Sequence, residues 1–153
     1  MSRPRAALDL RQKEFFTLFY ISRMDAPGVE ILLDIDREYR ARARSGELHR
    51  IAPRRQNPEG KAWLPVLHKR VEPWHFTALF SNTPRAHDLH RVYDWVVIFY
   101  SDHGADGQAT VVTERRGALA GRRVVRGREP ECARYYRGER ISTRAPSLSA
   151  SDG

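Results

Sequence analysis

The chain has 153 residues, of which 41% are hydrophobic and 30% charged, and it carries a formal net charge of +8. This length suits one domain with a real core and is short for two, and the hydrophobic content argues against a largely disordered chain. The single cysteine, Cys132, excludes an internal disulfide and an all-cysteine zinc site.

Residues 1–26 form an N-terminal arm whose structure the sequence pattern does not define. Its apolar run, Phe15–Ile21, is far shorter than the roughly 20 residues that span a bilayer, and no small-residue cleavage site of a signal peptide follows it. We therefore expect a cytoplasmic protein without a membrane segment. An apolar run of this kind is seldom left in water, which makes Phe15–Ile21 a candidate contact for a protein partner.

A single α+β domain is expected over residues 27–137, and it begins with a helix over roughly 28–45. Acidic residues gather in the first half of this segment and arginines in the second, an order that matches the helix dipole. Gly46 suits the position just past the end of the helix. The helical period itself is set by apolar side chains every four positions, at Ile31, Ile35, Tyr39 and Ala43.

Strands are expected after residues 52–60, where prolines and a glycine interrupt regular structure. Residues 63–68 and 74–80 predict a hairpin with a polar connection over 69–73. Pro65 places the first of these strands at a sheet edge, because proline cannot donate a hydrogen bond to a strand ladder.

A short helix and a long apolar strand come next. Thr83 and Pro84 predict the N-cap and the first residue of a helix that ends near Arg91. Residues 93–100 contain a nearly unbroken apolar run, which is typical of a central strand buried on both faces. A loop over 101–107 follows.

The last predicted strands form a hairpin over 110–128, with Val111 and Val112 facing Val124 and Val125. Pro130 marks a final short helix over 131–137, and residues 138–153 have the polar, small-residue composition of a disordered tail. The expected architecture is therefore α+β: a long N-terminal helix, a mainly antiparallel sheet of about five strands, two short helices and the tail.

Arginine is concentrated at the end of this domain. Residues 115–140 hold nine arginines against three glutamates, which gives a net +6 out of the chain's +8. A planar guanidinium group can donate two parallel hydrogen bonds to a phosphate, and clustered positive charge is typical of a phosphate-binding surface. The candidate nucleic-acid contacts are the arginines of the hairpin, Arg115, Arg116, Arg122, Arg123, Arg126 and Arg128.

Two other interpretations of the cluster stay open. The arginines can coat a solvated surface, partly neutralised by Glu114 and Glu129, or they can contact a protein partner. Adjacent residues on a strand point to opposite faces, so Arg122 and Arg123 should diverge. Tyr135 and Tyr136 follow the hairpin, and such rings can stack on unpaired bases.

An enzymatic activity is neither indicated nor excluded, since the chain contains no phosphate-binding glycine loop and no nucleophile motif. The alternative to a binding module is a metal-dependent enzyme acting on nucleic acid or nucleotides, with the metal held by His68, His75, His87 or Asp88. No ligand motif unites these residues, so we expect neither a metal nor another cofactor.

Two further patterns are interpreted without a catalytic role. Asp34 and Asp36 lie two positions apart, and on a helix such side chains diverge instead of converging on a metal, so we interpret them as charges that match the helix dipole. Cys132 lies near Arg128 and Arg134, which can lower a thiol pKa, yet no partner base is evident in the nearby sequence.

Five segments of the chain resemble a known family: VEILLDIDREYRARARSGELHRIAPRR, NPEGKAWLPVLH, WHFTALFSNTPRAHDL, DWVVIFY and TVVTERRGALAGRRVVRGRE. Together they are similar, over residues 27–137, to the C-terminal region of bacterial helix-hairpin-helix DNA-binding proteins, which are described alongside family X DNA polymerases. The resemblance implies DNA binding in repair or replication. It leads us to expect an aromatic residue at position 56 and a glycine near position 90, where this chain has Gln56 and His90.

The resemblance carries over no DNA-contacting residue. In that family the contacts are assigned to a helix-hairpin-helix motif with glycine-rich turns, which this chain lacks, and the polymerase carboxylates are absent as well. The resulting hypothesis is a non-enzymatic, DNA-associated module that contacts phosphates through the arginine-rich hairpin, with charge reversal at Arg122, Arg123 and Arg126 expected to abolish binding without loss of the fold.

Overall fold

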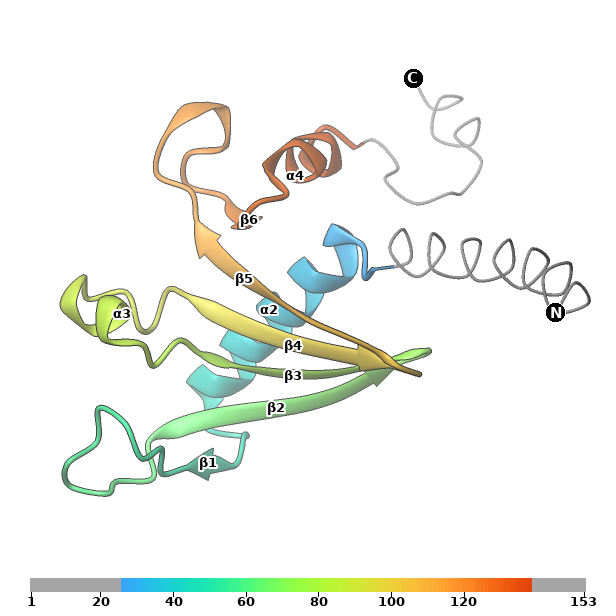
Figure 1. Cartoon of the computed structure of the whole chain (residues 1–153). Coiled ribbons are helices and arrows are strands. Elements are labelled where there is room, and N and C mark those ends of the chain that lie inside the picture. The colour runs from blue at the N-terminus through green and yellow to red at the C-terminus, as the bar shows by residue number, and fades with distance from the viewer. Residues whose placement is uncertain (1–25, 139–153) are drawn as a thin grey trace, which may run out of the picture.

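The computed structural model describes residues 26–138, which form a six-stranded antiparallel sheet with one long helix across one face (Figure 1). Each strand pairs with the next one along the chain. The helices are α2 (Val29–Ser45), α3 (Pro84–Asp88) and α4 (Glu129–Tyr136), and the strands are β1 (Arg50–Ile51), β2 (Leu64–Val71), β3 (Trp74–Phe80), β4 (Val96–Asp102), β5 (Ala105–Thr113) and β6 (Arg123–Val125). The α+β class is confirmed, with six strands where about five were expected.

Helix α2 holds the domain together through one apolar stripe. The stripe contains Val29, Leu32, Ile35 and Tyr39, all buried against the sheet. The hydroxyl of Tyr39 donates to the carbonyl of Pro65 at 2.7 Å and accepts from the amide of Phe80 at 2.9 Å, so a single buried phenol fixes the helix to β2 and β3.

The end of α2 is closed as the sequence predicts. Gly46 has φ of 80°, in the left-handed region that glycine adopts without steric cost. Its amide donates to the carbonyl groups of the last helical turn, at Ala43 and Arg42.

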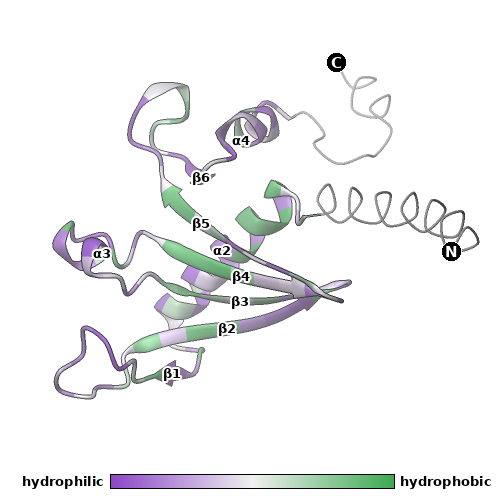
Figure 2. Ribbon diagram, viewed as in Figure 1, coloured by the Kyte–Doolittle hydropathy of each residue, from purple (hydrophilic) through white to green (hydrophobic). Residues whose placement is uncertain are grey.

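Only one face of the sheet is covered by α2, which corrects the expectation for β4. Val96 and Ile98 are buried under α2. Phe99, the next residue of the strand, points to the opposite face and exposes 45% of its surface. Figure 2 shows that β2 likewise changes from hydrophobic near its start to hydrophilic near the β2–β3 turn. The apolar run of β4 is therefore half-covered, because no second helix crosses the open face within residues 26–138.

Two further strand predictions were wrong in their bounds. β1 pairs Arg50 with Pro65, so β2 is not the edge strand at its proline. The connections 69–73 and 101–107 were drawn too long, since β2 runs to Val71 and β5 already begins at Ala105. In both hairpins the polar residues assigned to a loop continue the strand ladder beyond the covered part of the sheet.

Helix α3 begins at the predicted signal but ends at Asp88, before Arg91, and α4 begins at Glu129, two residues before the predicted start at 131. The Thr83 hydroxyl accepts from the amide of Ala86 at 3.1 Å, with Pro84 in the first turn. Soon after α3, His90 adopts φ of 56°, a backbone conformation that favours glycine.

Residues 1–25 and 139–153, and with them the candidate partner contact Phe15–Ile21, lie outside the described residues. Among the helices of the described part, none is long and apolar enough to cross a membrane.

Candidate nucleic-acid interface

The predicted hairpin exists in the expected register. Val111 pairs with Val125 and Val112 with Val124, which confirms the expected pairing of β5 with β6. Beyond the strands, the amide of Glu114 donates to the carbonyl of Arg122 at 2.8 Å, and a turn of 3₁₀ helix closes the loop. The structure thus places three arginines on one turn, Arg115, Arg116 and Arg122.

Arg115 and Arg116 are exposed, and neither guanidinium group has a hydrogen-bond or ion-pair partner within residues 26–138. The only carboxylate of the turn is that of Glu114, and it accepts from the backbone amide of Arg115 at 3.0 Å. These two side chains are therefore free to bind an anion.

Arg122 is exposed as well, but its guanidinium group lies 4.6 Å above the centre of the Tyr136 ring. The Tyr136 hydroxyl donates to the carbonyl of Arg123 at 2.6 Å, and burial raises the pKa of this phenol. Tyr135 packs edge-on against Tyr136 with ring centres 5.0 Å apart. The Tyr136 ring thus supports the hairpin, and the face covered by Arg122 is not open to a base.

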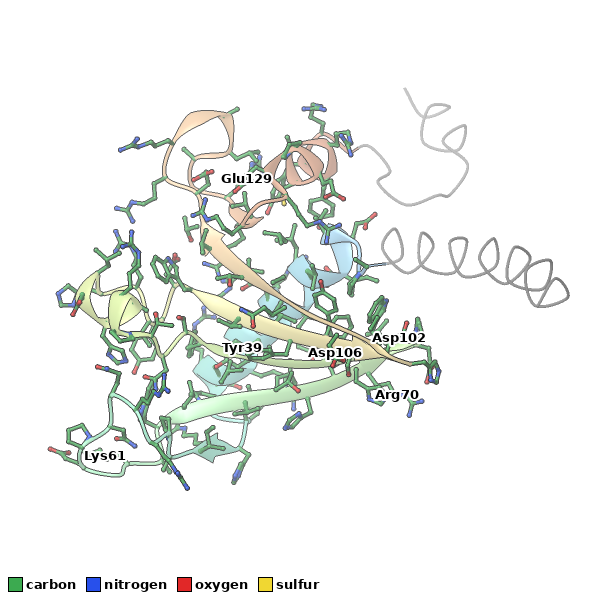
Figure 3. The ribbon with its side chains drawn as sticks, in the orientation of Figure 1. Tyr39, Lys61, Arg70, Asp102, Asp106 and Glu129 are labelled. Carbon is green, nitrogen blue, oxygen red and sulfur yellow. The ribbon has the colours of Figure 1, made fainter. Side chains whose placement is uncertain are left out.

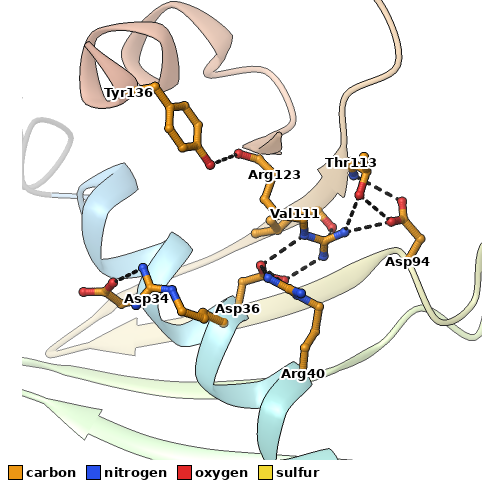
Figure 4. Close-up of polar contacts among 9 residues, drawn as sticks. Asp34, Asp36, Arg40, Asp94, Val111, Thr113, Arg123 and Tyr136 are labelled. Atoms are coloured by element: carbon orange, nitrogen blue, oxygen red, sulfur yellow. Dashed lines mark hydrogen bonds and ion pairs between the residues drawn. The ribbon is translucent and has the colours of Figure 1, made fainter. Parts of the chain in front are cut away.

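Arg123 points the other way, as strand alternation requires, and enters a buried network (Figure 4). Its Nε and Nη2 atoms donate to the two carboxylate oxygens of Asp36 at 3.1 and 2.7 Å. Its Nη1 donates to Asp94 at 2.9 Å and to the Thr113 hydroxyl at 3.0 Å. The Asp36 side chain is fully buried and that of Arg123 is only 14% exposed, so Arg123 is a structural residue of the core.

This network changes the interpretation of Asp34 and Asp36. Asp34 is exposed and pairs with Arg37 at 2.8 Å, whereas Asp36 is held by both Arg123 and Arg40. The diverging directions expected of residues two apart are confirmed, but Asp36 does not serve only to match the helix dipole. It joins α2 to β6, two elements far apart in the sequence.

Arg126 and Arg128 both have acidic partners. Arg126 contacts Glu129 at 3.3 Å near the surface. Arg128 donates to both oxygens of Glu131, at 2.7 and 2.8 Å, and to the carbonyl of Pro27. The hydrogen bonds from Arg128 lower the pKa of the Glu131 carboxyl, and the same contact raises the pKa of Arg128. Arg128 thus ties the start of α4 to the segment before α2, whereas the Arg126–Glu129 pair is local and exposed.

The residues of the metal hypothesis do not converge. His68 contacts the Thr77 hydroxyl at 3.2 Å across the β2–β3 pair, while His87 on α3 contacts Asn82 at 2.7 Å. Across residues 26–138 no three histidine, cysteine or acidic side chains are grouped so as to hold a metal ion.

Cys132 is buried, and its sulfur accepts a hydrogen bond from the Val125 amide at 3.3 Å. Burial raises the pKa of the thiol. The chemistry expected of Cys132 is that of an unreactive core residue.

Within residues 26–138, the structure thus divides the six predicted contacts into two arginines of the turn without a partner, one on an aromatic ring and three with acidic partners. Comparison with family models, with curated proteins and with solved structures found no match to this chain.

Proposed function

We propose that the protein is a non-enzymatic, DNA-associated nucleic-acid-binding module whose β5–β6 turn contacts backbone phosphates. The observation that supports this proposal is the free state of Arg115 and Arg116, two exposed guanidinium groups on one turn with no acidic partner among the described residues. Arg126 and Arg128 on the same hairpin already have acidic partners, so they offer less free charge to a phosphate.

Two contacts hold the backbone from which Arg115 and Arg116 project. Arg123 fixes the base of the turn to α2, and the Glu114–Arg122 backbone pair closes it. A backbone that is held in place loses less entropy on binding than a mobile loop does. The likeness of residues 27–137 to helix-hairpin-helix proteins is what suggests DNA as the polyanion and repair or replication as the context.

The test is a titration of labelled single- and double-stranded oligonucleotides with the full chain. We expect Arg115→Gln with Arg116→Gln to weaken binding about tenfold or more, because two phosphate contacts are lost. The matched control is Arg37→Gln with Arg70→Gln, which removes the same charge from exposed arginines that already pair with Asp34 and Glu72.

The control should keep nearly full affinity. Figure 3 places Arg70 with Asp102 and Asp106 at the end of the sheet far from Lys61 and the turn region. Equal affinity of wild type and the turn variant would refute the proposal. An equal loss in both variants would show that only the net charge matters.

A further inference from the structure

A second cationic site lies beside the turn. A cleft of about 700 Å³ opens between the last turns of α2, the β1–β2 connection and the ends of β3 and β5. Its charged lining consists of five cationic side chains and one carboxylate, Arg40, Arg44, Arg50, Lys61, Arg123 and Asp94. This volume is in the range of small-molecule sites.

The positive charge of the cleft is only partly neutralised. Arg123 bridges Asp94 and Asp36, and Arg40 shares Asp36, so these four groups cancel. Lys61 has an exposed ion pair with Glu59 at 3.1 Å, which is weak because water screens it.

Arg44 and Arg50 remain, and both are exposed without an acidic partner in the described part of the chain. Two unpaired guanidinium groups facing one cleft attract an anion that can accept several hydrogen bonds.

The cleft lining also has an aromatic part. Trp63, Phe80 and Tyr93 form it, with Tyr93 edge-on to Trp63 at 6.1 Å and to Phe80 at 5.1 Å between ring centres. Tyr93 is 69% exposed, the largest exposed fraction among the large hydrophobic side chains described. An exposed ring costs hydrophobic free energy that a stacked planar ligand would recover.

We propose that this cleft binds one nucleotide, with its phosphate on Arg44 and Arg50 and its base against Trp63 and Tyr93. The two halves of the lining match the two halves of that ligand: an anion with several acceptors and a flat aromatic ring. The inference deepens the proposed function, because the cleft would hold an unpaired nucleotide of the strand whose further phosphates reach the turn. Thr113 and Arg123 line the cleft, and Arg115 of the turn lies two residues after Thr113.

The first experiment compares ligands on the full-length protein. Calorimetric titrations would use dAMP, deoxyadenosine, inorganic phosphate and a 5′-phosphorylated oligo(dA). We expect dAMP to bind about tenfold or more tightly than either deoxyadenosine or phosphate, because only the nucleotide uses both parts of the lining. No binding of dAMP at millimolar concentration, or equal binding of dAMP and phosphate, would overturn the inference.

The second experiment uses variants. Arg44→Gln with Arg50→Gln should weaken dAMP binding about tenfold. Tyr93→Leu, which keeps an apolar contact with Phe80, should weaken the binding of dAMP but not that of phosphate. The Arg37→Gln, Arg70→Gln control should bind dAMP normally. Unchanged dAMP affinity in both cleft variants would place the ligand elsewhere and refute the assignment.

The turn variant separates this inference from the proposed function. Arg115→Gln with Arg116→Gln should leave the affinity for dAMP unchanged and weaken oligonucleotide binding. If dAMP binds in the cleft but the turn variant keeps full oligonucleotide affinity, the cleft site stands and the proposed function fails. If the turn variant weakens oligonucleotide binding but dAMP does not bind, the proposed function stands and the cleft site fails.

The affinities of oligo(dA) and dAMP show whether the cleft binds a nucleotide within a strand or a free nucleotide. An oligo(dA) that binds much more tightly than dAMP indicates a unit within a strand. Equal affinities indicate a free nucleotide. Both results support the cleft as a nucleotide site.

Discussion

Replacement of Arg123 by methionine gives the sharpest test of how the hairpin is built. The substitution keeps an unbranched apolar side chain of similar length but removes the guanidinium group from the buried network. Among residues 26–138, Asp36 then retains only Arg40, whose Nε and Nη2 atoms both contact Oδ2 at 3.1 and 3.0 Å, so Oδ1 loses its partner.

Breaking one partner of a buried ion pair costs about 3–5 kcal/mol, and because Arg40 remains we expect about 3 kcal/mol here. A domain of ordinary size has a free energy of unfolding of about 5–15 kcal/mol. The loss would therefore be a large fraction of the total. The measurement is the free energy of unfolding from urea denaturation of the full chain.

Arg126→Met is the matched control on the same hairpin. Its ion pair with Glu129 is exposed, and such pairs contribute about 1 kcal/mol or less. Asp36→Leu combined with Arg123→Met should recover most of the lost stability, since it removes both buried charges. A loss below about 1 kcal/mol for Arg123→Met, no larger than that of the control, would refute the structural role.

Other predictions concern the core and the last helix. Tyr39→Phe should lower the free energy of unfolding by about 2–4 kcal/mol, since it leaves a buried carbonyl and a buried amide unpaired; urea denaturation measures it, and a loss under about 1 kcal/mol would contradict it. The lowered pKa of Glu131 gives stability that is present above its usual pKa of 4.5 and lost as the pH falls through the folded value. The stability difference between wild type and Glu131→Gln should therefore be constant near neutral pH and shrink in acid, and a pH-independent difference would argue against the contact with Arg128. Cys132 should not react with a thiol reagent in the native protein and should react fully in urea; rapid native labelling would show that its site is open.

Local signals predicted the elements whose structure depends on nearby residues. The four-residue period and Gly46 defined α2, and Thr83 with Pro84 defined the start of α3. The valine pairs aligned β5 with β6. In each case the deciding contacts lie within one helix or one hairpin.

The sequence interpretation failed where contacts join distant segments. β1 has two residues and no pattern of its own, and only the fold shows that Phe99 lies on an uncovered face. The burial of Arg123 depends on Asp36 in α2, but one signal was present: Asp36 falls on the buried side of α2, four residues after Leu32 and three before Tyr39. A carboxylate on a buried stripe needs a cation or hydrogen-bond donors beside it, and an arginine supplies both.

The candidate site could be predicted only as a region. Sequence spacing could not distinguish Arg115 and Arg116, which have no acidic partner in the described part of the chain, from Arg126 and Arg128, which do. The proposed charge reversal of Arg122, Arg123 and Arg126 would therefore damage the core through Arg123. The substitutions that test binding alone are those at the turn.

The central claim is that Arg115 and Arg116 bind phosphates, and the salt dependence of the dissociation constant tests it most directly. Each phosphate contact adds about 0.9 to the slope of log affinity against log salt concentration on duplex DNA and about 0.7 on a single strand. We predict that Arg115→Gln with Arg116→Gln lowers the slope by about 1.8 or 1.4 respectively. An unchanged slope in that variant would contradict the account.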